Sequence, residues 1–381
     1  MSKRKKINPS IEKILWAITA GRCEKCGRLI YQHPLSKTIG NFAQIAHNLP
    51  VGDKGPRSEY KKIEENGDIN DINNLLLLCY DCHKEIDEIH PEKFPPTLLR
   101  QIKNDFEEFI IKATNIERII PTLAIKYSPN LHGQQLIISG IQKAIFPDKA
   151  IKTEVDLTLR NSTFFDNELM FWTIEEKNLI ESFNHKITPL IKDYQNGYLN
   201  ISVFAIGPIP LLIKLGELLS NKQSVDVYQL KKSPVSSWEW ETVEDDTEYI
   251  INYLHKSDNP HRIIMILSIS GQVNYDDVKQ TVAWDDSIVV EIKTNQKRPY
   301  DDFLRNKKQL EKFVKCYQQL KEELRTIGGT GNHIHVFAAV PVSVAVEIGR
   351  HRNKNVDLPM IIYNLTDHKY TNALTIGKED E

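Results

Sequence analysis

The stretch Asn74-Leu75-Leu76-Leu77-Leu78-Cys79-Tyr80-Asp81-Cys82-His83 decides the fold of the N-terminal part of the chain. It joins a run of four leucines to a Cys-x-x-Cys pair, and a second such pair, Cys23-Glu24-Lys25-Cys26, lies upstream. A two-residue spacer lets both sulfurs of a pair face one ion, at about 2.3 Å for zinc. The four cysteines therefore predict a tetrahedral zinc site, and thiolates at all four positions make that site structural. The predicted ligands are Cys23, Cys26, Cys79 and Cys82.

The residues around these pairs carry a second pattern. His47 lies between the two pairs, Asn74 precedes the leucine run, and His83 follows the last cysteine. This His…Asn…His order resembles the HNH, or ββα-metal, nucleases. The resemblance implies that His47, on the first strand, activates water and that His83, at the start of the helix, holds magnesium or another divalent metal. Both roles suit an imidazole, which can take a proton from water near neutral pH or bind a cation that stabilises charge on a phosphate.

The second protein ligand of this catalytic metal is less clearly defined. In the family an acidic residue usually precedes the first histidine, and here that position is Ala46. Three aspartates are candidates to replace it, ranked in the order Asp87, Asp53 and Asp71. Asp87 comes first because it lies four residues after His83, on the same face of the expected helix. Asn74 could either orient His47 through a hydrogen bond or complete the metal shell, and both roles are open.

Contact with a nucleic acid is expected from one short loop. The formal net charge is −2, which gives no overall attraction to a polyanion, so DNA binding requires a local basic patch. The turn-rich segment 51–57 carries Lys54 and Arg57, two cations suited to backbone phosphates. A solvated loop is the alternative interpretation for either cation.

The other N-terminal segments are predicted as helices or strands from their apolar spacing. The predicted helices cover residues 9–20, 81–88 and 96–115. The predicted hairpin has its strands at 29–32 and 44–46. Ser10 is the expected cap of the first helix.

Composition bounds the class of protein. At 381 residues the chain exceeds the usual size of one domain. No apolar stretch approaches the roughly 18 to 20 residues needed to cross a bilayer, and the basic segment Met1–Lys6 is not followed by the apolar core of a signal peptide. Four of the five cysteines lie in the two pairs, which fits the reducing cytoplasm. The fifth, Cys316, is expected to be a small buried side chain.

The composition changes near Arg118, where the cysteine pairs end and apolar strands begin, so we place the two domains at 1–117 and 118–381. The second domain contains a repeat. Residues 201–216 (ISVFAIGPIPLLIKLG) align with 334–349 (IHVFAAVPVSVAVEIG), so that a phenylalanine, an alanine, a proline and a glycine recur in register. Each copy reads as strand, proline turn, helix and strand, which predicts a duplicated Rossmann-like α/β domain.

In such sheets, ligands bind beyond the carboxyl ends of the strands, where helix N-termini offer N–H groups to anions. The two proline turns, 207–210 and 340–343, are therefore expected to bind the two phosphates of one ligand. Nearby lysines could neutralise phosphate and aromatic rings could stack on bases, although tryptophans that fill the core are an equal alternative. The expected ligand residues are Pro208, Ile209, Pro210, Tyr228, Lys231, Lys232, Trp238, Trp240, Pro341 and Ser343. Arg350 and Arg352, one turn past the second helix, could contact the ligand or a neighbouring subunit, and a position at the solvated surface is the default expectation for each.

The segment from about 120 to 369 resembles a SAVED domain, a fused pair of CARF-like units that senses cyclic oligonucleotides. The matching residues include 203–211, 227–229, 238–240 and 336–349. With its HNH part, the whole chain is similar to the HNH-SAVED effector nucleases of bacterial CBASS antiphage systems. The resemblance implies activation by a cyclic dinucleotide of the cGAMP type and assembly into a homo-oligomer, a dimer that grows larger on activation. It also implies degradation of double-stranded DNA with little sequence preference.

Two other interpretations compete with this one. The zinc part could be a ribbon that binds DNA or protein under ligand control without cleaving it. A second nuclease centre could lie at Glu291-Ile292-Lys293, which follows Asp285 and Asp286 and superficially matches the D…ExK pattern of another nuclease class. Such triplets are common at strand ends, which weakens the second alternative.

Overall fold

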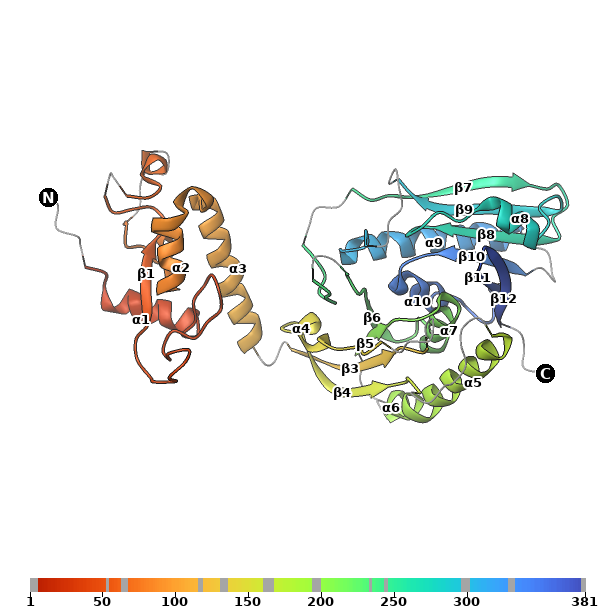
Figure 1. Cartoon of the computed structure of the whole chain (residues 1–381), viewed down its shortest axis with the longest axis horizontal. Helices are drawn as coiled ribbons and strands as arrows, with labels where there is room; N and C mark the ends of the chain where they lie inside the picture. Colours follow the sequence, from red (N-terminus) through yellow and green to blue (C-terminus); the bar gives the residue numbers. More distant parts are fainter. Residues whose placement is uncertain are drawn as a thin grey trace. The chain divides into compact units, whose positions relative to one another are not determined.

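The computed structural model describes residues 6–52, 55–62, 68–115, 119–130, 136–159, 168–193, 200–232, 235–242, 246–295, 302–327 and 333–377. The chain divides into two compact units, Met1–Ile119 and Ile120–Glu381 (Figure 1). The boundary expected between residues 117 and 118 lies beside this division. None of the described helices is long and apolar enough to cross a membrane.

The N-terminal unit is a two-stranded hairpin with helices packed around it. Its main elements are α1 (Pro9–Ile18), β1 (Ala43–His47), β2 (Leu75–Cys79), α2 (Tyr80–Lys84) and α3 (Pro96–Thr114). A π-helical turn covers Glu85–Ile89, and 3₁₀ turns cover Ser58–Lys62, Ile72–Asn74 and Pro91–Lys93. β1 pairs antiparallel with β2, so that His47 lies opposite Leu75. Every residue of β2 is buried, and Leu76, Leu77 and Leu78 pack with side chains of the helices in one core.

Two expectations for this unit are wrong in detail. The cap of α1 is Asn8, whose side-chain oxygen accepts a hydrogen bond from the Ser10 backbone at 2.9 Å. Pro9 occupies the first helical position, so Ser10 lies inside the helix rather than before it. Residues 29–32 form only isolated bridges, and the partner of β1 is β2. All five residues of β2 are buried in this position, whereas only Ile30 of residues 29–32 is buried, and burial of apolar side chains favours the observed pairing.

The C-terminal unit contains two sheets. The smaller sheet is parallel and has the order β4-β3-β5-β6. In the larger sheet, of order β12-β11-β10-β8-β9-β7, the inner strands are parallel and the two edge strands, β12 and β7, are antiparallel to their neighbours. The strands are β3 (Ile120–Tyr127), β4 (Lys149–Asp156), β5 (Asn200–Ala205), β6 (Ser224–Tyr228), β7 (Tyr249–Lys256), β8 (Arg262–Ser268), β9 (Ser287–Thr294), β10 (Ile334–Ala339), β11 (Met360–Thr366) and β12 (Lys369–Ile376). The helices are α4 (Ile141–Ile145), α5 (Leu169–Lys186), α6 (Thr188–Asp193), α7 (Ile209–Leu219), α8 (Tyr275–Thr281), α9 (Lys307–Ile327) and α10 (Val342–Arg350).

The predicted duplication is confirmed. β5, α7 and β6 form the first copy, and β10, α10 and β11 form the second. In each copy the phenylalanine of the first strand stacks on a tyrosine of the second strand. The ring centroids of Phe204 and Tyr228 are 4.5 Å apart, and those of Phe337 and Tyr363 are 4.4 Å apart. Both pairs belong to outer clusters, separate from the central core that contains α7 and α10.

The helices α7 and α10 pack against each other in the middle of the unit (Figure 1). Two glycines at matching positions of the repeat make this contact possible. A Cβ atom added at Gly216 would lie 2.0 Å from the Val346 carbonyl oxygen, and one added at Gly349 would lie 1.8 Å from the Ile213 carbonyl oxygen. The backbones of the two helices are therefore in direct contact at these two glycines.

Charged side chains are buried beside this helix pair. Arg352 pairs with Glu217 at 3.0 Å, and Arg350 pairs with Glu347 at 2.7 Å. All of these residues are buried, so the expectation that the two arginines lie at the solvated surface is wrong. A buried guanidinium needs an anionic partner, and the helices supply one for each.

Candidate active site

The four cysteines of the N-terminal unit lie together. Their sulfur atoms are all within 4.8 Å of one another, and Cys26 Sγ and Cys79 Sγ are 3.8 Å apart. Glu24 brings the first pair to the second through two hydrogen bonds. Its backbone N–H donates to the Leu77 carbonyl at 3.0 Å, and its side-chain Oε2 accepts from the Leu77 N–H at 2.6 Å. The first cysteine pair is thereby attached to β2.

Burial makes this cluster a fit for a cation. Burial raises the pKa of the Cys23 thiol to about 11 and the pKa of Cys82 well above its ordinary value. Thiols in such a site do not ionise together unless a positive ion compensates their charge. Four sulfurs from two Cys-x-x-Cys pairs are a donor set that suits a closed tetrahedral metal site.

A pocket of about 600 Å³ opens elsewhere on the same unit. It is lined by His47, from the end of β1, and by His83, from α2. Asp87 and Arg57 also line it, together with the loop residues on either side of position 53. Because α2 packs back against β1, the two histidines face one cavity although they lie far apart in the sequence.

His47 is held by a side-chain contact. Its Nε2 lies 3.0 Å from Oδ1 of Asn70, and both residues are buried. Because an amide oxygen only accepts hydrogen bonds, this contact favours the tautomer in which Nε2 carries the hydrogen and Nδ1 is free. This is the state that a general base needs. The sequence prediction missed Asn70, whose one signal is its place in the Asp- and Asn-rich turn 68–74.

The side chain of Asn74 bonds to backbone groups rather than to the His47 ring. Its side-chain oxygen accepts from the Leu49 N–H at 2.8 Å. Its side-chain nitrogen donates to the carbonyls of Leu49 at 3.1 Å and Ile69 at 2.9 Å. Asn74 therefore joins the loop after His47 to the segment that carries Asn70. These bonds use both ends of its amide, which explains why it does not orient the His47 ring.

His83 and Asp87 lie one helical turn apart, as expected. His83 Nε2 and Asp87 Oδ2 are 3.6 Å apart, and both side chains are partly exposed. The helix widens here into a π turn, in which the His90 N–H donates to the Glu85 carbonyl at 2.9 Å. Such turns are frequent at functional sites. An imidazole and a carboxylate are suitable donors for a divalent metal in this pocket.

The other charged residues expected near the site are placed differently. Asp71 caps a 3₁₀ turn, accepting from the Asn73 N–H at 2.9 Å. Asp53 and Lys54 lie outside the described residues. Arg57 is buried and pairs with Asp87 at 2.6 Å, so the expectation that it meets DNA phosphates from an exposed loop is wrong.

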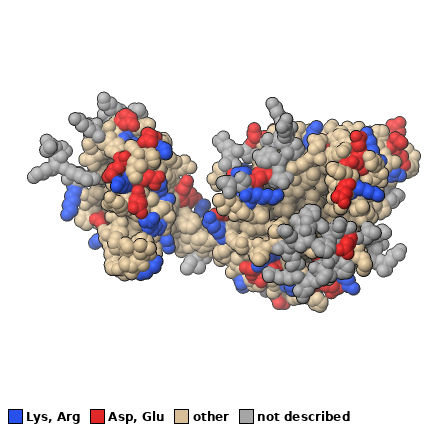
Figure 2. Space-filling view, in the orientation of Figure 1, with Lys and Arg blue, Asp and Glu red and all other residues tan. Residues whose placement is uncertain are grey.

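The charges on the face shown in Figure 2 give no separate indication of a DNA path. On the face shown in Figure 2, basic and acidic side chains are interspersed over the N-terminal unit rather than gathered into one basic patch. The local features that indicate chemistry are therefore the pocket and its histidines.

The proline turns of the C-terminal unit lie at the carboxyl ends of β5 and β10, as expected. Pro208 and Pro341 are the N-cap residues of α7 and α10, and Ile209 and Pro210 begin α7. Ser343, in the first turn of α10, is fully buried. Its backbone N–H and its hydroxyl both donate to Gln229 Oε1, at 3.1 and 2.8 Å. These groups link the two copies of the repeat instead of facing a ligand.

The aromatic residues expected to stack on bases lie in the core. Trp238 and Tyr228 are both buried against Phe204, and Trp238 meets the Phe204 ring edge-on with centroids 5.3 Å apart. Trp240 is partly buried between two apolar clusters. The expectation that Tyr228 and Trp238 offer free faces to a ligand is wrong, and the alternative, tryptophans that fill the core, describes them.

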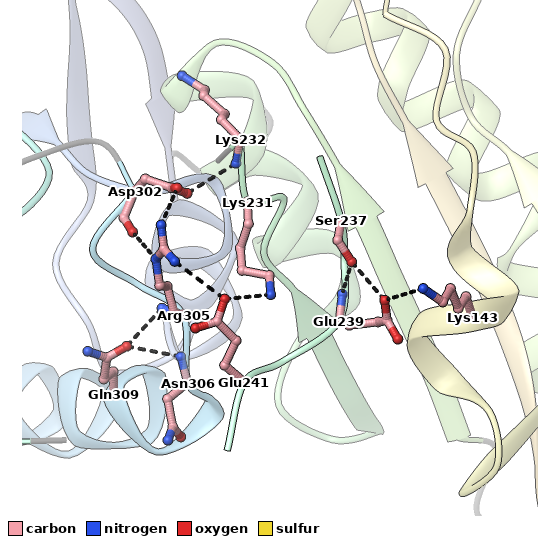
Figure 3. A network of polar contacts seen from close by, with 10 residues as sticks. All are labelled: Lys143, Lys231, Lys232, Ser237, Glu239, Glu241, Asp302, Arg305, Asn306 and Gln309. Carbon is pink, nitrogen blue, oxygen red and sulfur yellow. Dashed lines mark hydrogen bonds and ion pairs between the residues drawn. The ribbon is translucent and has the colours of Figure 1, made fainter. Parts of the chain in front are cut away.

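The lysines after β6 belong to a polar network (Figure 3). Lys231 pairs with Glu241 at 2.9 Å, and Glu241 pairs in turn with Arg305 at 3.5 Å. The Lys232 N–H donates to Asp302 at 3.1 Å, and Asp302 pairs with Arg305 at 2.8 Å. The network thus connects the segment after β6 of one sheet to the segment before α9. Figure 3 shows the Lys232 side chain pointing away from these partners.

The second nuclease pattern does not form a centre. Glu291 is fully buried in β9, and its Oε2 accepts from the Tyr275 hydroxyl at 2.8 Å. Asp286 immediately precedes the first residue of β9 and pairs with Arg262 at 3.3 Å. At about 3.3 Å per residue of strand, the two acids are about 16 Å apart along the chain. They are too distant to share a metal ion.

Two family models match the chain. "SMODS-associated and fused to various effectors sensor domain", or SAVED, matches residues 179–376, and "HNH endonuclease" matches residues 23–90. No curated protein matched the chain.

Solved structures similar to the chain include two Cap4 receptors that contain SAVED/CARF domains. One is from Acinetobacter baumannii, with the cyclic trinucleotide 3′3′3′-cAAA, at 13% identity and a TM-score of 0.41, covering 76% of this chain and 61% of that one. The other is from Moraxella osloensis, at 11% identity and a TM-score of 0.42, covering 74% of this chain and 60% of that one. This chain thus spans about three fifths of the length of these receptors.

Proposed function

The chain belongs to the SAVED family and carries an HNH endonuclease domain, and from this premise we propose that it is a nuclease controlled by a cyclic oligonucleotide. The observation that supports this most is the placement of His47 and His83 on one pocket, inside the segment that matches the HNH endonuclease. A module that only binds DNA or protein does not need a histidine whose contact with an amide oxygen favours a free Nδ1 for proton transfer.

The chemistry follows from the residues of the pocket. His47 is the general base: its Nδ1 takes a proton from a water molecule, whose oxygen attacks the phosphorus as the bond to the 3′ oxygen breaks. His83, with Asp87 beside it, would hold the divalent metal that HNH nucleases use, magnesium or a similar ion. When bound, that ion supplies positive charge for the phosphate and the leaving oxygen. The four cysteines hold zinc in a purely structural role.

The proposed substrate is double-stranded DNA, cut with little sequence preference. The proposed activator is a cyclic dinucleotide of the cGAMP type that binds the SAVED domain and drives assembly into a larger homo-oligomer. Together these make the protein an effector of a CBASS-type antiphage system in the cytoplasm. The support for this proposal is the resemblance of the two domains and their order in one chain.

Control by a ligand has a calculable cost. An unspecific nuclease damages its own cell, so the active state must be rare until the ligand binds. A shift from about 1:99 to 99:1 requires that the ligand bind the active state about 5.5 kcal/mol more tightly than the inactive state. Assembly can supply part of this difference, because each new contact between subunits forms only in the active state.

The proposal is tested by incubating plasmid DNA with the purified full-length protein, Mg²⁺ and a panel of cyclic di- and trinucleotides. We expect cleavage that requires both the metal and one cyclic nucleotide. His47→Ala should lose cleavage and keep ligand-driven assembly, measured by analytical ultracentrifugation. Cleavage by His47→Ala at the rate of the unmodified protein would contradict the assignment of the base. Binding of plasmid without any cleavage would favour a regulated zinc module instead.

A further inference from the structure

Arg57 connects two elements of the candidate active site. Its Nε donates to the Asn48 carbonyl at 2.9 Å and its Nη2 to the His47 carbonyl at 3.2 Å, both at the end of β1. On the other side, Nη1 donates to the Ile86 carbonyl at 3.1 Å and Nη2 to Asp87 Oδ1 at 2.6 Å. One guanidinium thus bonds the strand end that carries His47 and the helical turn that follows His83.

These bonds use nearly all of the hydrogen-bonding capacity of the side chain. A guanidinium has five N–H donors, and the four bonds above leave one, on Nη1. The Arg57 side chain is only 3% exposed. A cation that serves DNA phosphates needs donors directed to solvent, and this one directs its donors to carbonyls and a carboxylate of its own fold.

The backbone around Arg57 is held in a conformation that an arginine adopts at a cost. Its φ is +63°, in the left-handed region that glycine and asparagine accept more readily. The loop also packs closely at Gly55, where an added Cβ would lie 2.8 Å from Cβ of Pro50. Strain of this kind persists where a side chain is needed for a function that the easier residues cannot supply.

Asp87 extends the connection to the second histidine. Its Oδ1 accepts from Arg57, while its Oδ2 lies 3.6 Å from His83 Nε2. This separation is longer than a hydrogen bond, but the negative carboxylate still attracts an N–H on that side of the ring and so favours one orientation, with the other ring nitrogen left for a metal. The chain of contacts therefore runs from the His47 backbone through Arg57 and Asp87 to the His83 ring.

We propose that Arg57 is a positioning residue that sets the spacing between the base His47 and the metal-binding His83, with Asp87 as its anchor. The inference rests on the proposed nuclease function. It differs from the role in DNA binding that the sequence predicted for this loop. Lysine cannot replace Arg57, because a single ammonium group does not span acceptors on two elements in a fixed plane.

The first test measures cleavage of plasmid by full-length protein with Mg²⁺ and the same panel of cyclic nucleotides. Arg57→Ala and Arg57→Lys are each expected to lower kcat about 100-fold, the usual loss when a reacting group moves by about 1 Å. The KM for DNA and its salt dependence should not change. Arg28→Ala is the control, because it removes an exposed ion pair with Asp81 on the same unit and should keep the normal kcat.

The opposite pattern would overturn the proposal. Loss of a phosphate contact raises KM and makes its salt dependence shallower, while kcat stays the same. An unmodified protein that cleaves nothing would remove the proposed function and this inference together. An active unmodified protein with an equally active Arg57→Ala would remove this inference alone.

Chemical rescue separates positioning from a general loss of folding. Guanidinium ion at millimolar concentration, added to Arg57→Ala, can fill the vacated space and bridge the same acceptors, so we expect a partial return of kcat. We expect no return for Arg57→Lys, where the side chain occupies the space, or for Asp87→Asn, which lacks the anionic anchor. Rescue of all three variants, or of none, would contradict the proposal.

Binding of Mn²⁺, followed by electron paramagnetic resonance of the free ion, gives a reading that does not depend on cleavage. Mn²⁺ prefers oxygen and imidazole donors and does not replace zinc among thiolates. Arg57→Ala and Asp87→Asn are both expected to weaken Mn²⁺ binding about 10-fold or more, because the His83 ring loses its support. Unchanged affinity in both variants would show that Arg57 does not act on His83.

Discussion

At His47, one amide decides which ring nitrogen is free to accept a proton. Asn70 Oδ1, 3.0 Å from Nε2, can only accept, so it selects the tautomer with Nδ1 unprotonated. A carboxylate at the same position would accept the same hydrogen bond and would also stabilise the protonated ring. Substitutions at position 70 can therefore separate the orientation of the base from its charge.

Asn70→Asp is expected to move the acidic limb of the kcat profile to higher pH, because the new carboxylate favours the protonated ring, which is not a base. Asn70→Ala loses the hydrogen bond and is expected to lower kcat by about 10- to 100-fold across the profile. Both are measured as cleavage rates between pH 5 and pH 9. Asn73→Asp adds the same charge at an exposed neighbouring position and should leave the profile in place. A profile for Asn70→Asp that coincides with that of Asn73→Asp would contradict the contact.

The residues that the sequence identified and those that it missed differ in chemistry. Cysteine and histidine have distinctive spacings at metal sites, so the order of residues was enough to predict that the four cysteines lie together and that His83 shares a pocket with His47. Arg57 was expected to bind DNA, but its bonds to backbone carbonyls, like the contact of Asn70 with an imidazole far along the chain, are not revealed by any pattern of side chains. Asn74 shows the converse: it fits a motif by position, but its amide is used by the backbone of Leu49.

At the scale of elements, the contact between α7 and α10 depends on the absence of side chains at two points. Gly216→Ala and Gly349→Ala are each expected to lower the free energy of unfolding of the C-terminal unit by about 1 to 3 kcal/mol or more, because the new methyl meets backbone that cannot move aside. Urea unfolding followed by circular dichroism measures the change. In Gly271→Ala the methyl would meet Ala339 at 3.4 Å, an ordinary contact, and the effect should be small. If Gly216→Ala and Gly349→Ala lowered the free energy of unfolding no more than Gly271→Ala does, the two helices would be able to move apart at little cost.

A second element-scale prediction concerns Asp226 of β6, which pairs with Lys149 of β4 and with Lys307 at the start of α9. Burial alone would raise the pKa of Asp226, but hydrogen bonds from the two lysines lower it from 3.8 to about 2. The carboxylate therefore stabilises the folded state above about pH 4, and this contribution is lost as the pH falls towards 2.

Asp226→Asn is accordingly expected to lower the free energy of unfolding by about 2 kcal/mol at pH 7 and by about half as much at pH 3. Urea unfolding at the two pH values measures the difference between the variant and the unmodified protein. A difference of the same size at both pH values would mean that the lysines stabilise Asp226 by packing and not by attraction to its ionised carboxylate.

Sequence periodicity predicted the repeated strand–helix–strand units but not how elements pair. The strand at 44–46 was recognised, yet its partner was placed at 29–32 instead of 75–79, because pairing depends on which surfaces the fold buries. Trp238 was expected to meet a ligand because it follows two lysines. Its actual neighbour, Phe204, lies on β5, and only the assembled sheet brings the two rings together.

At the scale of the whole molecule, the two compact units have separate apolar cores. The core of the N-terminal unit includes three of the clustered cysteines, whereas the central core of the C-terminal unit contains none of them. The α/β fold class and the combination of an HNH with a SAVED domain could be predicted from local motifs, because each motif lies within one unit. Net charge gave no such help, since −2 over the chain is compatible with many classes of protein.

Separate cores imply that metal removal affects one unit only. Without a cation, the burial that raises the pKa of Cys23 and Cys82 keeps these thiols protonated, and no ion joins the first cysteine pair to the second. Structural zinc contributes on the order of 10 kcal/mol to small domains of this kind. We therefore expect two thermal transitions in calorimetry, one of which disappears or falls by tens of degrees on treatment with a strong zinc chelator.

Cys79→Ser should reproduce the effect of the chelator, because it removes one of the four sulfurs. Cys316→Ser changes a cysteine that packs on the central core of the C-terminal unit and should leave the chelator-sensitive transition unchanged. A cyclic nucleotide that binds the SAVED domain should raise only the other transition, since a ligand stabilises the state that binds it. If the chelator lowered both transitions equally, the two units would be unfolding as one, and the cysteine cluster would support the whole molecule rather than the unit that carries His47 and His83.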